Sequence, residues 1–201
     1  MNYQLVLDET LKTLKGTPKL LLHACCAPCS SYVLEYLSNY FEITVFFYNP
    51  NIDLESEFDY RLEELERFIK EFPSKNKIEL VHVGYNHDDF KEISIGLEHE
   101  PERGKRCLKC YKMRLEKSFI YAKTHHFDYI TTTLTLSPHK NSQVINEIGQ
   151  ELEKQCQVNY LYSDFKKRDG YKRSIILSHE YNLYRQDYCG CEYSRRKAIE
   201  E

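Results

Sequence analysis

Cysteine is the residue type of this chain whose number and spacing point most directly to chemistry. Seven of the eight cysteines have another cysteine one to three positions away: Cys25, Cys26, Cys29, Cys107, Cys110, Cys189 and Cys191. The first residues carry acidic side chains and no apolar core, and no apolar run approaches the ~20 residues of a membrane span. We therefore expect a cytoplasmic protein with no membrane partner. Grouped thiols in that reducing compartment indicate metal binding or catalysis before structural disulfides.

The spacing of the thiols separates the possible metal centres. A zinc ribbon needs two CxxC pairs about 15–20 residues apart, whereas 77 residues (30–106) separate Cys29 from Cys107. A structural zinc assembled across the fold and a thioredoxin-like dithiol both stay open. Zinc and a [4Fe–4S] cluster each take four ligands. The seven grouped cysteines are therefore best explained by four thiols that bind a cluster and three that remain for another role. The eighth cysteine, Cys156, ends a predicted helix and is interpreted as a buried bystander.

The first cysteine group lies in a predicted strand–turn–helix. Leu20, Leu21 and Leu22 form an apolar run that predicts a strand at about 19–24, and a helix is expected at about 30–39. Such a turn directs backbone N–H groups and the positive end of the helix dipole at the sulfurs. We therefore expect all three sulfurs of this group to favour the thiolate form.

The rest of the chain alternates between strands and helices. Apolar and β-branched segments predict five strands, at about 19–24, 43–49, 78–85, 129–136 and 158–163. Helices are expected between them, at about 3–15, 30–39, 56–72, 87–95, 107–127 and 142–156. This alternation predicts an α/β fold with a mainly parallel, five-stranded, doubly wound sheet. With strand order 3-2-1-4-5, the turns after strands one and four would meet at one crevice.

Length and charge suggest one domain, 1–201, with a basic helical C-terminal elaboration over 164–201. Residues 1–100 carry a net charge of −9 and residues 101–201 a net charge of +6. The basic residues of the second half gather in three groups: Arg103, Lys105, Arg106, Lys109, Lys112 and Arg114; Lys166, Lys167, Arg168, Lys172 and Arg173; and Arg195, Arg196 and Lys197. Such a half could face a polyanion, although charge runs are usually only solvated faces.

Four motifs together resemble one known family. They are HACCAPCS at 23–30, CLKCY at 107–111 with Arg114, TTLTLSPHK at 132–140, and YCGC at 188–191. In this order they resemble the QueH family of cobalamin-independent epoxyqueuosine reductases, over about residues 18–197. The resemblance implies a HUP-type Rossmann-like fold and the last step of queuosine biosynthesis, the reduction of epoxyqueuosine to queuosine at the tRNA wobble position.

The same resemblance implies cofactors and their ligands. A [4Fe–4S] cluster would be bound by Cys25, Cys26, Cys107 and Cys110. Cys189 and Cys191 would be either a redox-active pair, able to form a disulfide, or ligands of an additional iron ion, and Cys29 is left to that second site. The electron donor stays unidentified.

Other candidates lie near the motifs in sequence. Removing an epoxide oxygen requires a proton donor, for which Asp187, His139, His23 and Tyr111 are candidates. Lys140, beside a predicted helix N-terminus, suits a phosphate of tRNA or a substrate group. The tRNA-facing candidates are Lys109, Lys112, Arg114, Lys166, Lys167 and Arg168, and some tyrosines could stack on bases.

Two alternative functions stay open. A cluster-containing PP-loop-like enzyme of tRNA sulfur transfer would need an ATP-binding loop, but cysteines occupy the place of a Gly-rich loop after strand one, so we expect no ATP. A zinc-stabilised RNA-binding module without catalysis is the second. Absorbance near 400 nm would favour iron–sulfur over zinc.

Overall fold

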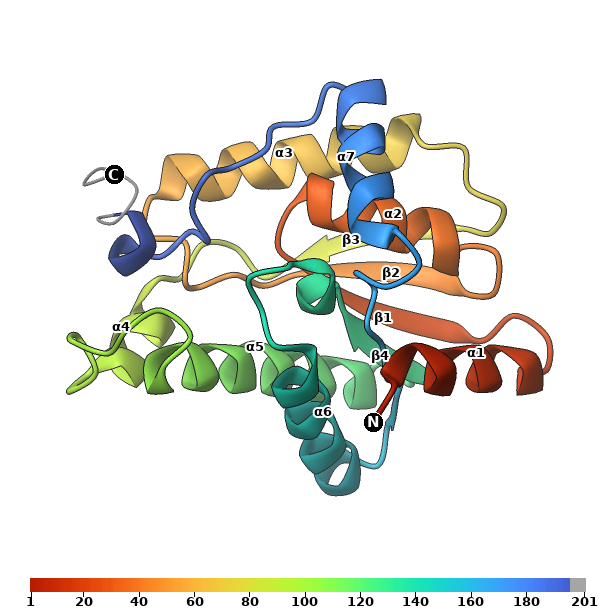
Figure 1. Ribbon diagram of the computed structural model, residues 1–201, viewed down its shortest axis with the longest axis horizontal. Helices are drawn as coiled ribbons and strands as arrows, with labels where there is room; N and C mark the ends of the chain where they lie inside the picture. The colour runs from red at the N-terminus through yellow and green to blue at the C-terminus, as the bar shows by residue number, and fades with distance from the viewer. Residues whose placement is uncertain (196–201) are drawn as a thin grey trace.

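Five parallel strands form the centre of the computed structural model, which describes residues 1–195 (Figure 1). The strands are β1 (Lys19–Ala24), β2 (Glu42–Phe47), β3 (Ile78–His82), β4 (Tyr129–Thr132) and β5 (Asn159–Tyr160). Their order is β3-β2-β1-β4-β5, and each neighbouring pair is parallel. The predicted α/β class and strand order are confirmed. β1 therefore lies in the middle, with the turn that follows it at the switch point of the sheet.

Helices cover both faces of this sheet. They are α1 (Tyr3–Thr13), α2 (Ala27–Leu37), α3 (Glu55–Glu71), α4 (Asp88–Ser94), α5 (Lys105–Thr124), α6 (Ser142–Cys156) and α7 (Gly170–Glu180). α2 and α3 lie on one side, with α7 packed against α2, and α5 and α6 lie on the other (Figure 1). Leu20 and Leu22 of β1 pack with Phe68 of α3, whereas Leu21 packs with Leu115 of α5. A strand buried on both faces needs such a continuous apolar run.

Two predicted strands end earlier in the structure than the sequence pattern suggests. Strand four was expected at 129–136, but Thr133–Leu136 form a short 3-10 helix, η1, because the Thr132 side chain accepts a hydrogen bond from the Leu134 N–H. Strand five was expected at 158–163, but β5 ends at Tyr160. The amide of Asn146 on α6 then bonds both the N–H and the C=O of Ser163, and so replaces a neighbouring strand.

One predicted helix begins earlier than expected. The first helix after β1 starts at Ala27 rather than near residue 30, because Pro28 occupies its first turn. Proline is tolerated there, since the first N–H groups of a helix have no partner within the helix. Cys29 therefore lies inside α2 rather than before it.

The C-terminal part of the chain is only partly helical. After α7, residues 181–191 run without regular structure along the α3 side of the molecule, and residues 192–195 form a final helical turn (Figure 1). Arg196 and Lys197 of the expected basic tail lie outside the described residues. A single domain with an elaboration at 164–201 stays a prediction. Among the described residues, no helix has the length and apolar character needed to cross a membrane.

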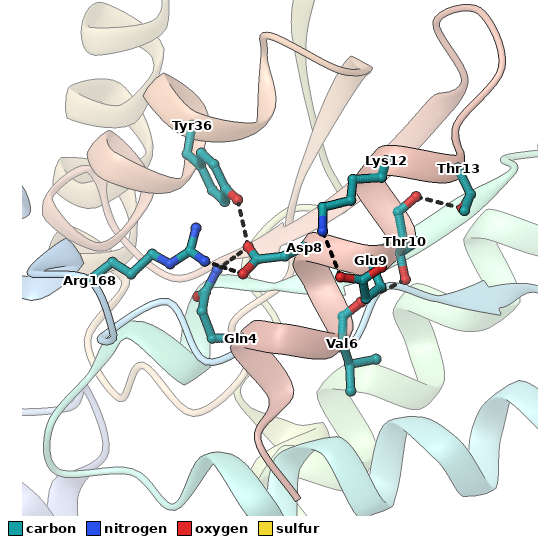
Figure 2. A network of polar contacts seen from close by, with 9 residues as sticks. All are labelled: Gln4, Val6, Asp8, Glu9, Thr10, Lys12, Thr13, Tyr36 and Arg168. Carbon is teal, nitrogen blue, oxygen red and sulfur yellow. Dashed lines mark hydrogen bonds and ion pairs between the residues drawn. The ribbon is translucent and has the colours of Figure 1, made fainter.

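A polar network around Asp8 ties three segments together (Figure 2). Asp8 of α1, 12% exposed, accepts hydrogen bonds from Gln4 at 3.0 Å and from the Tyr36 hydroxyl of α2 at 3.4 Å. Arg168, in the loop before α7, forms an ion pair with the same carboxylate. One buried acceptor thus connects α1, α2 and the approach to α7, and Arg168 has an intramolecular partner.

Replacing Asp8 by Ala should lower the free energy of unfolding by about 1–2 kcal/mol, because three donors lose one acceptor. The Arg168 share is small, since that side chain is 58% exposed. Urea or thermal unfolding measures the change. The control is Glu9→Ala, whose carboxylate pairs with Lys12 on the surface and whose loss should cost less than about 0.5 kcal/mol. Equal stabilities of the two variants would contradict this role for Asp8.

Candidate metal and redox site

All seven grouped cysteines meet beyond the carboxyl ends of the central strands. The sulfurs of Cys25, Cys26 and Cys29, at the junction of β1 and α2, lie within 4.8 Å of one another. Cys107 and Cys110 lie in the first two turns of α5. Cys189 and Cys191, whose sulfurs are 3.6 Å apart, come from the segment after α7. Segments far apart in the sequence therefore bring thiols to one place.

Two adjoining cavities separate these thiols. The larger, of about 380 Å³, is lined by Cys25, Cys29 and Cys189. The smaller, of about 30 Å³, is lined by Cys107, Cys110, Cys189 and Cys191. Five residues line both: Glu102, Arg114, His139, Lys140 and Cys189. Cys26 is buried beside the larger cavity, whereas Cys156 packs at the α5–α6 core away from it.

The grouping of the sulfurs differs from the four-ligand set that the resemblance implies. The tightest group is Cys25, Cys26 and Cys29, and the second CxxC pair lies with the C-terminal pair at the other cavity. Three thiols cannot complete a cluster that takes four, so a fourth ligand has to come from across the site. Seven thiols from three segments around one crevice are a donor set compatible with an iron–sulfur centre.

Each tight cysteine group holds one thiol of low pKa. Hydrogen bonds from Cys26 and Cys29 lower the pKa of Cys25 well below its usual range, while burial raises the pKa of Cys26 to about 12. A hydrogen bond from Cys191 likewise lowers the pKa of Cys189 to about 5, and the pKa of Cys191 rises. Of the three sulfurs at the first turn, only Cys25 has a lowered pKa, whereas the expectation was that all three favour the thiolate form. A single thiolate per group, stabilised by its neighbouring S–H donors, carries the negative charge.

Lys140 lies between the two thiolates. Burial lowers the pKa of Lys140, but the nearby Cys25, Cys189 and Cys29 more than offset this, and the net pKa is raised. Lys140 also lines both cavities, in the turn after η1. It is therefore a cation directed at the thiol site, not an outward-facing charge.

Arg114 also faces the site. Its side chain is 3% exposed, it donates to the Asn49 side-chain oxygen and to His23 Nε2, and it lines both cavities. We expected Arg114 on an outward basic face with Lys109 and Lys112. This prediction was wrong, because the Arg114 side chain points from α5 toward β1 and is buried there.

Burial holds the ring of His23 in the neutral form. Nδ1 of His23 lies 2.8 Å from the Thr132 hydroxyl, and Nε2 lies 3.3 Å from Arg114 Nε and 3.2 Å from the Tyr48 carbonyl oxygen, so both ring nitrogens have polar partners. A second proton would place two cations together, and burial and Arg114 lower the pKa of His23 to about 3. His23 therefore anchors Arg114 and is a poor proton donor near neutral pH.

The other sequence candidates occupy three kinds of position. Tyr111 is buried beside Cys107 and Cys110, and burial raises its pKa. His139 and Asp187 are exposed at the mouth of the larger cavity. The three basic candidates before α7 line neither of these two cavities, and two of them have acidic partners: Lys166 pairs with Asp164, Arg168 pairs with Asp8, and Lys167 is exposed.

Two parts of the site were missed at the sequence level. The loop after β2 binds the C-terminal cysteine turn, since Asn51 Nδ2 donates to the Cys189 carbonyl at 3.2 Å and the Asp53 N–H to the Gly190 carbonyl at 3.0 Å. Arg61 of α3, 1% exposed, packs against the same turn. The sequence pattern could have indicated Arg61, because this charged residue lies three positions after Phe58, within the apolar stripe of a predicted helix.

The fold and the site define a Rossmann-like α/β protein with a buried thiol centre at the carboxyl edge of its sheet. The family described as "Epoxyqueuosine reductase QueH" matches residues 20–197. Among curated proteins, "Epoxyqueuosine reductase QueH" of Streptococcus pyogenes is 42% identical over 98% of this chain and 79% of its own. Those of Staphylococcus epidermidis and Thermotoga maritima are 41% and 30% identical, over 98% and 87% of this chain and 86% and 89% of their own. The chain belongs to the QueH family.

The depressed pKa of His23 predicts a pH-dependent stability. The unfolded imidazole takes a proton near pH 6.5, whereas the folded ring does so only near pH 3. The unfolded state therefore binds more protons between these values, and stability falls as the pH decreases from 6.5 toward 3. The contribution of this ring between pH 7 and pH 5 is about 2 kcal/mol.

Urea unfolding at several pH values tests this. His23→Gln should flatten the pH dependence between pH 7 and pH 5 relative to the unsubstituted protein. His179→Gln, an exposed position on α7, is the matched control and should leave the slope as it is. An unchanged slope in His23→Gln would show that the ring is not held neutral.

Proposed function

We propose that this chain reduces epoxyqueuosine to queuosine in tRNA through a thiol-bound iron–sulfur centre. The observation that carries the proposal is the meeting of seven thiols from three family motifs around one crevice. Membership of the QueH family and the printed activity of its relatives support the same reaction. A thiol-rich crevice without a phosphate-binding loop is less suited to the PP-loop-like alternative.

The reaction sets what the site must supply. Removing the epoxide oxygen to leave a cyclopentene takes two electrons and two protons and releases one water molecule. A [4Fe–4S] cluster, when bound, supplies electrons one at a time, so a second redox centre is required. We propose Cys25, Cys26, Cys107 and Cys110 as the cluster ligands, with Cys29, Cys189 and Cys191 left for an additional iron or a redox-active dithiol.

The cationic side chains of the crevice have roles of their own. Lys140 stabilises the thiolates of Cys25 and Cys189, and Arg114 stabilises that of Cys25. An ammonium group at a cavity wall can also donate a hydrogen bond to the developing negative charge on the epoxide oxygen. His139 and Asp187, at the mouth, are placed to exchange protons with solvent. We assign the proton supply to this set.

The larger cavity suits a nucleobase taken out of its stack. Enzymes that act on a base generally extrude it into a pocket, and Tyr171, Tyr188 and Arg185 line this cavity with flat surfaces. Aromatic and guanidinium planes stack on bases without regard to sequence. Lys166, Lys167 and Arg168 stay candidates for phosphate contacts on the α7 side.

The direct test is an anaerobic assay. Protein purified without oxygen is incubated with epoxyqueuosine-containing tRNA and a chemical reductant, and the nucleosides are analysed by mass spectrometry. We expect queuosine to appear in proportion to the iron content. Zinc in place of iron and sulfide, or an iron-loaded protein that leaves epoxyqueuosine intact, would contradict the proposal.

The ligand set predicts the effect of removing one thiol. Cys107→Ala should strip iron and sulfide from the anaerobically purified protein and bleach its absorbance near 400 nm, because the cluster loses one of four ligands. Cys156→Ser is the matched control and should keep the full metal content. Full iron and sulfide in Cys107→Ala would exclude that ligand.

The C-terminal pair predicts a different outcome. Cys189→Ser and Cys191→Ser should keep the cluster absorbance and bind tRNA, yet lose at least 100-fold in epoxide reduction, because the second centre is removed. A colourless or aggregating Cys191→Ser protein would instead make the pair structural. Full activity would remove the pair from the reaction altogether.

A further inference from the structure

Arg61 is a guanidinium group buried where the helix pattern calls for an apolar side chain. It belongs to the face of α3 that carries Phe58 and Leu65 into the core. Its side chain is 1% exposed, and Nε forms an ion pair at 2.7 Å with Glu57, one turn earlier. Nη2 is buried and has no hydrogen-bond partner in the described structure. A buried charge that is only partly satisfied is costly and is kept where it has a function.

The guanidinium lies directly behind the C-terminal cysteine turn. Its Nη1 is 3.3 Å from the point where a Cβ on Gly190 would lie, and its Cζ is 5.3 Å from the centre of the Tyr188 ring. Gly190 has φ +111°, a conformation that other residues rarely adopt. The close approach of Arg61 therefore depends on the glycine between Cys189 and Cys191.

The charge of Arg61 acts on the sulfurs of the first cysteine group, while its Nη1 lies against the backbone of the C-terminal turn at Gly190. Glu57 bonds only Nε, so the Nη end of the ion pair faces the turn. Burial lowers the pKa of Arg61, but the nearby Cys26, Glu57 and Cys25 offset it and raise the net pKa. Arg61 thus lies between the first cysteine group and the C-terminal turn.

We propose that Arg61 is a positioning residue that holds the Cys189–Cys191 turn beside the first cysteine group and keeps a permanent positive charge behind the metal centre. The inference rests on the proposed iron–sulfur function. An electron added to the centre makes it more negative, and a fixed cation nearby stabilises that reduced state. Arg61 therefore raises the midpoint potential, and Glu57 lowers it by partly neutralising Arg61.

A redox titration of the anaerobically purified holoprotein tests the charge. Arg61→Gln should lower the midpoint potential enough to reduce the ratio of reduced to oxidised centre about tenfold at a fixed potential, which is 59 mV for a one-electron couple. Glu57→Gln should shift it upward, because Arg61 then lacks its carboxylate. Arg67→Gln is the control, since Arg67 lies on the same helix, is 40% exposed and pairs with Glu71, and the potential should stay as it is.

The outcomes separate this inference from the proposed function. A purified protein without an iron–sulfur signal overturns both. A normal signal whose potential is the same in Arg61→Gln, Glu57→Gln and the unsubstituted protein overturns the role of Arg61 alone, and a lower melting temperature without a potential shift makes Arg61 structural. If Arg61→Gln does not fold, the upward shift in Glu57→Gln decides. Arg61→Lys, which keeps the charge but loses the planar fork, should recover most of the potential.

Discussion

The burial of sulfur anions is the constraint on which the rest of this structure depends. Two thiols of low pKa, Cys25 and Cys189, line the larger cavity and are only partly exposed to solvent. The charge has to be balanced by neighbouring S–H donors and by cations close to the sulfurs. Arg61, Arg114 and Lys140 supply those cations from three different elements. None of the three is an ordinary surface residue. Arg61 and Arg114 are buried, and Lys140 is half-buried at the cavity wall.

The fold makes this balance possible through its topology. β1 lies between β2 and β4, so the turns after these strands converge at one edge. The turn after β1 brings Cys25 and Cys26, the segment after η1 brings Lys140, and the loop after β2 brings Asn49 and the residues that bind the C-terminal turn. α5 adds its first two turns from the side. The parallel sheet therefore fixes the positions of three loops and of the start of α5, which together carry the residues of the site.

Sequence reasoning was accurate where a local pattern or a topological rule decides the outcome. Strand and helix positions follow from periodicity, and the rule for parallel sheets, given the strand order, places the turns after β1 and β4 at one crevice. The direction of Arg114 did not follow, because both faces of α5 carry charged residues and only the contact with His23 decides which face is buried. Arg61 escaped notice for a related reason: a single arginine in an apolar stripe is explained only by what lies opposite it. The sulfur pKa values likewise depend on hydrogen bonds between thiols, which spacing along the chain does not define.

The last segment of the chain completes a site that the rest of the fold leaves unfinished. Residues 181–191 have no regular structure, and their cysteine turn is fixed by side-chain and backbone contacts to the loop after β2, not by a helix or a strand. The segment is joined to the core by Leu183 and Tyr181, which pack into the cluster beside α3. Gly190 leaves room for the guanidinium of Arg61, because a Cβ at this position would lie only 3.3 Å from Nη1. The positions of Cys189 and Cys191 therefore depend on long-range contacts with α3 and its preceding loop, and this couples the geometry of the second thiol pair to the packing of the whole sheet.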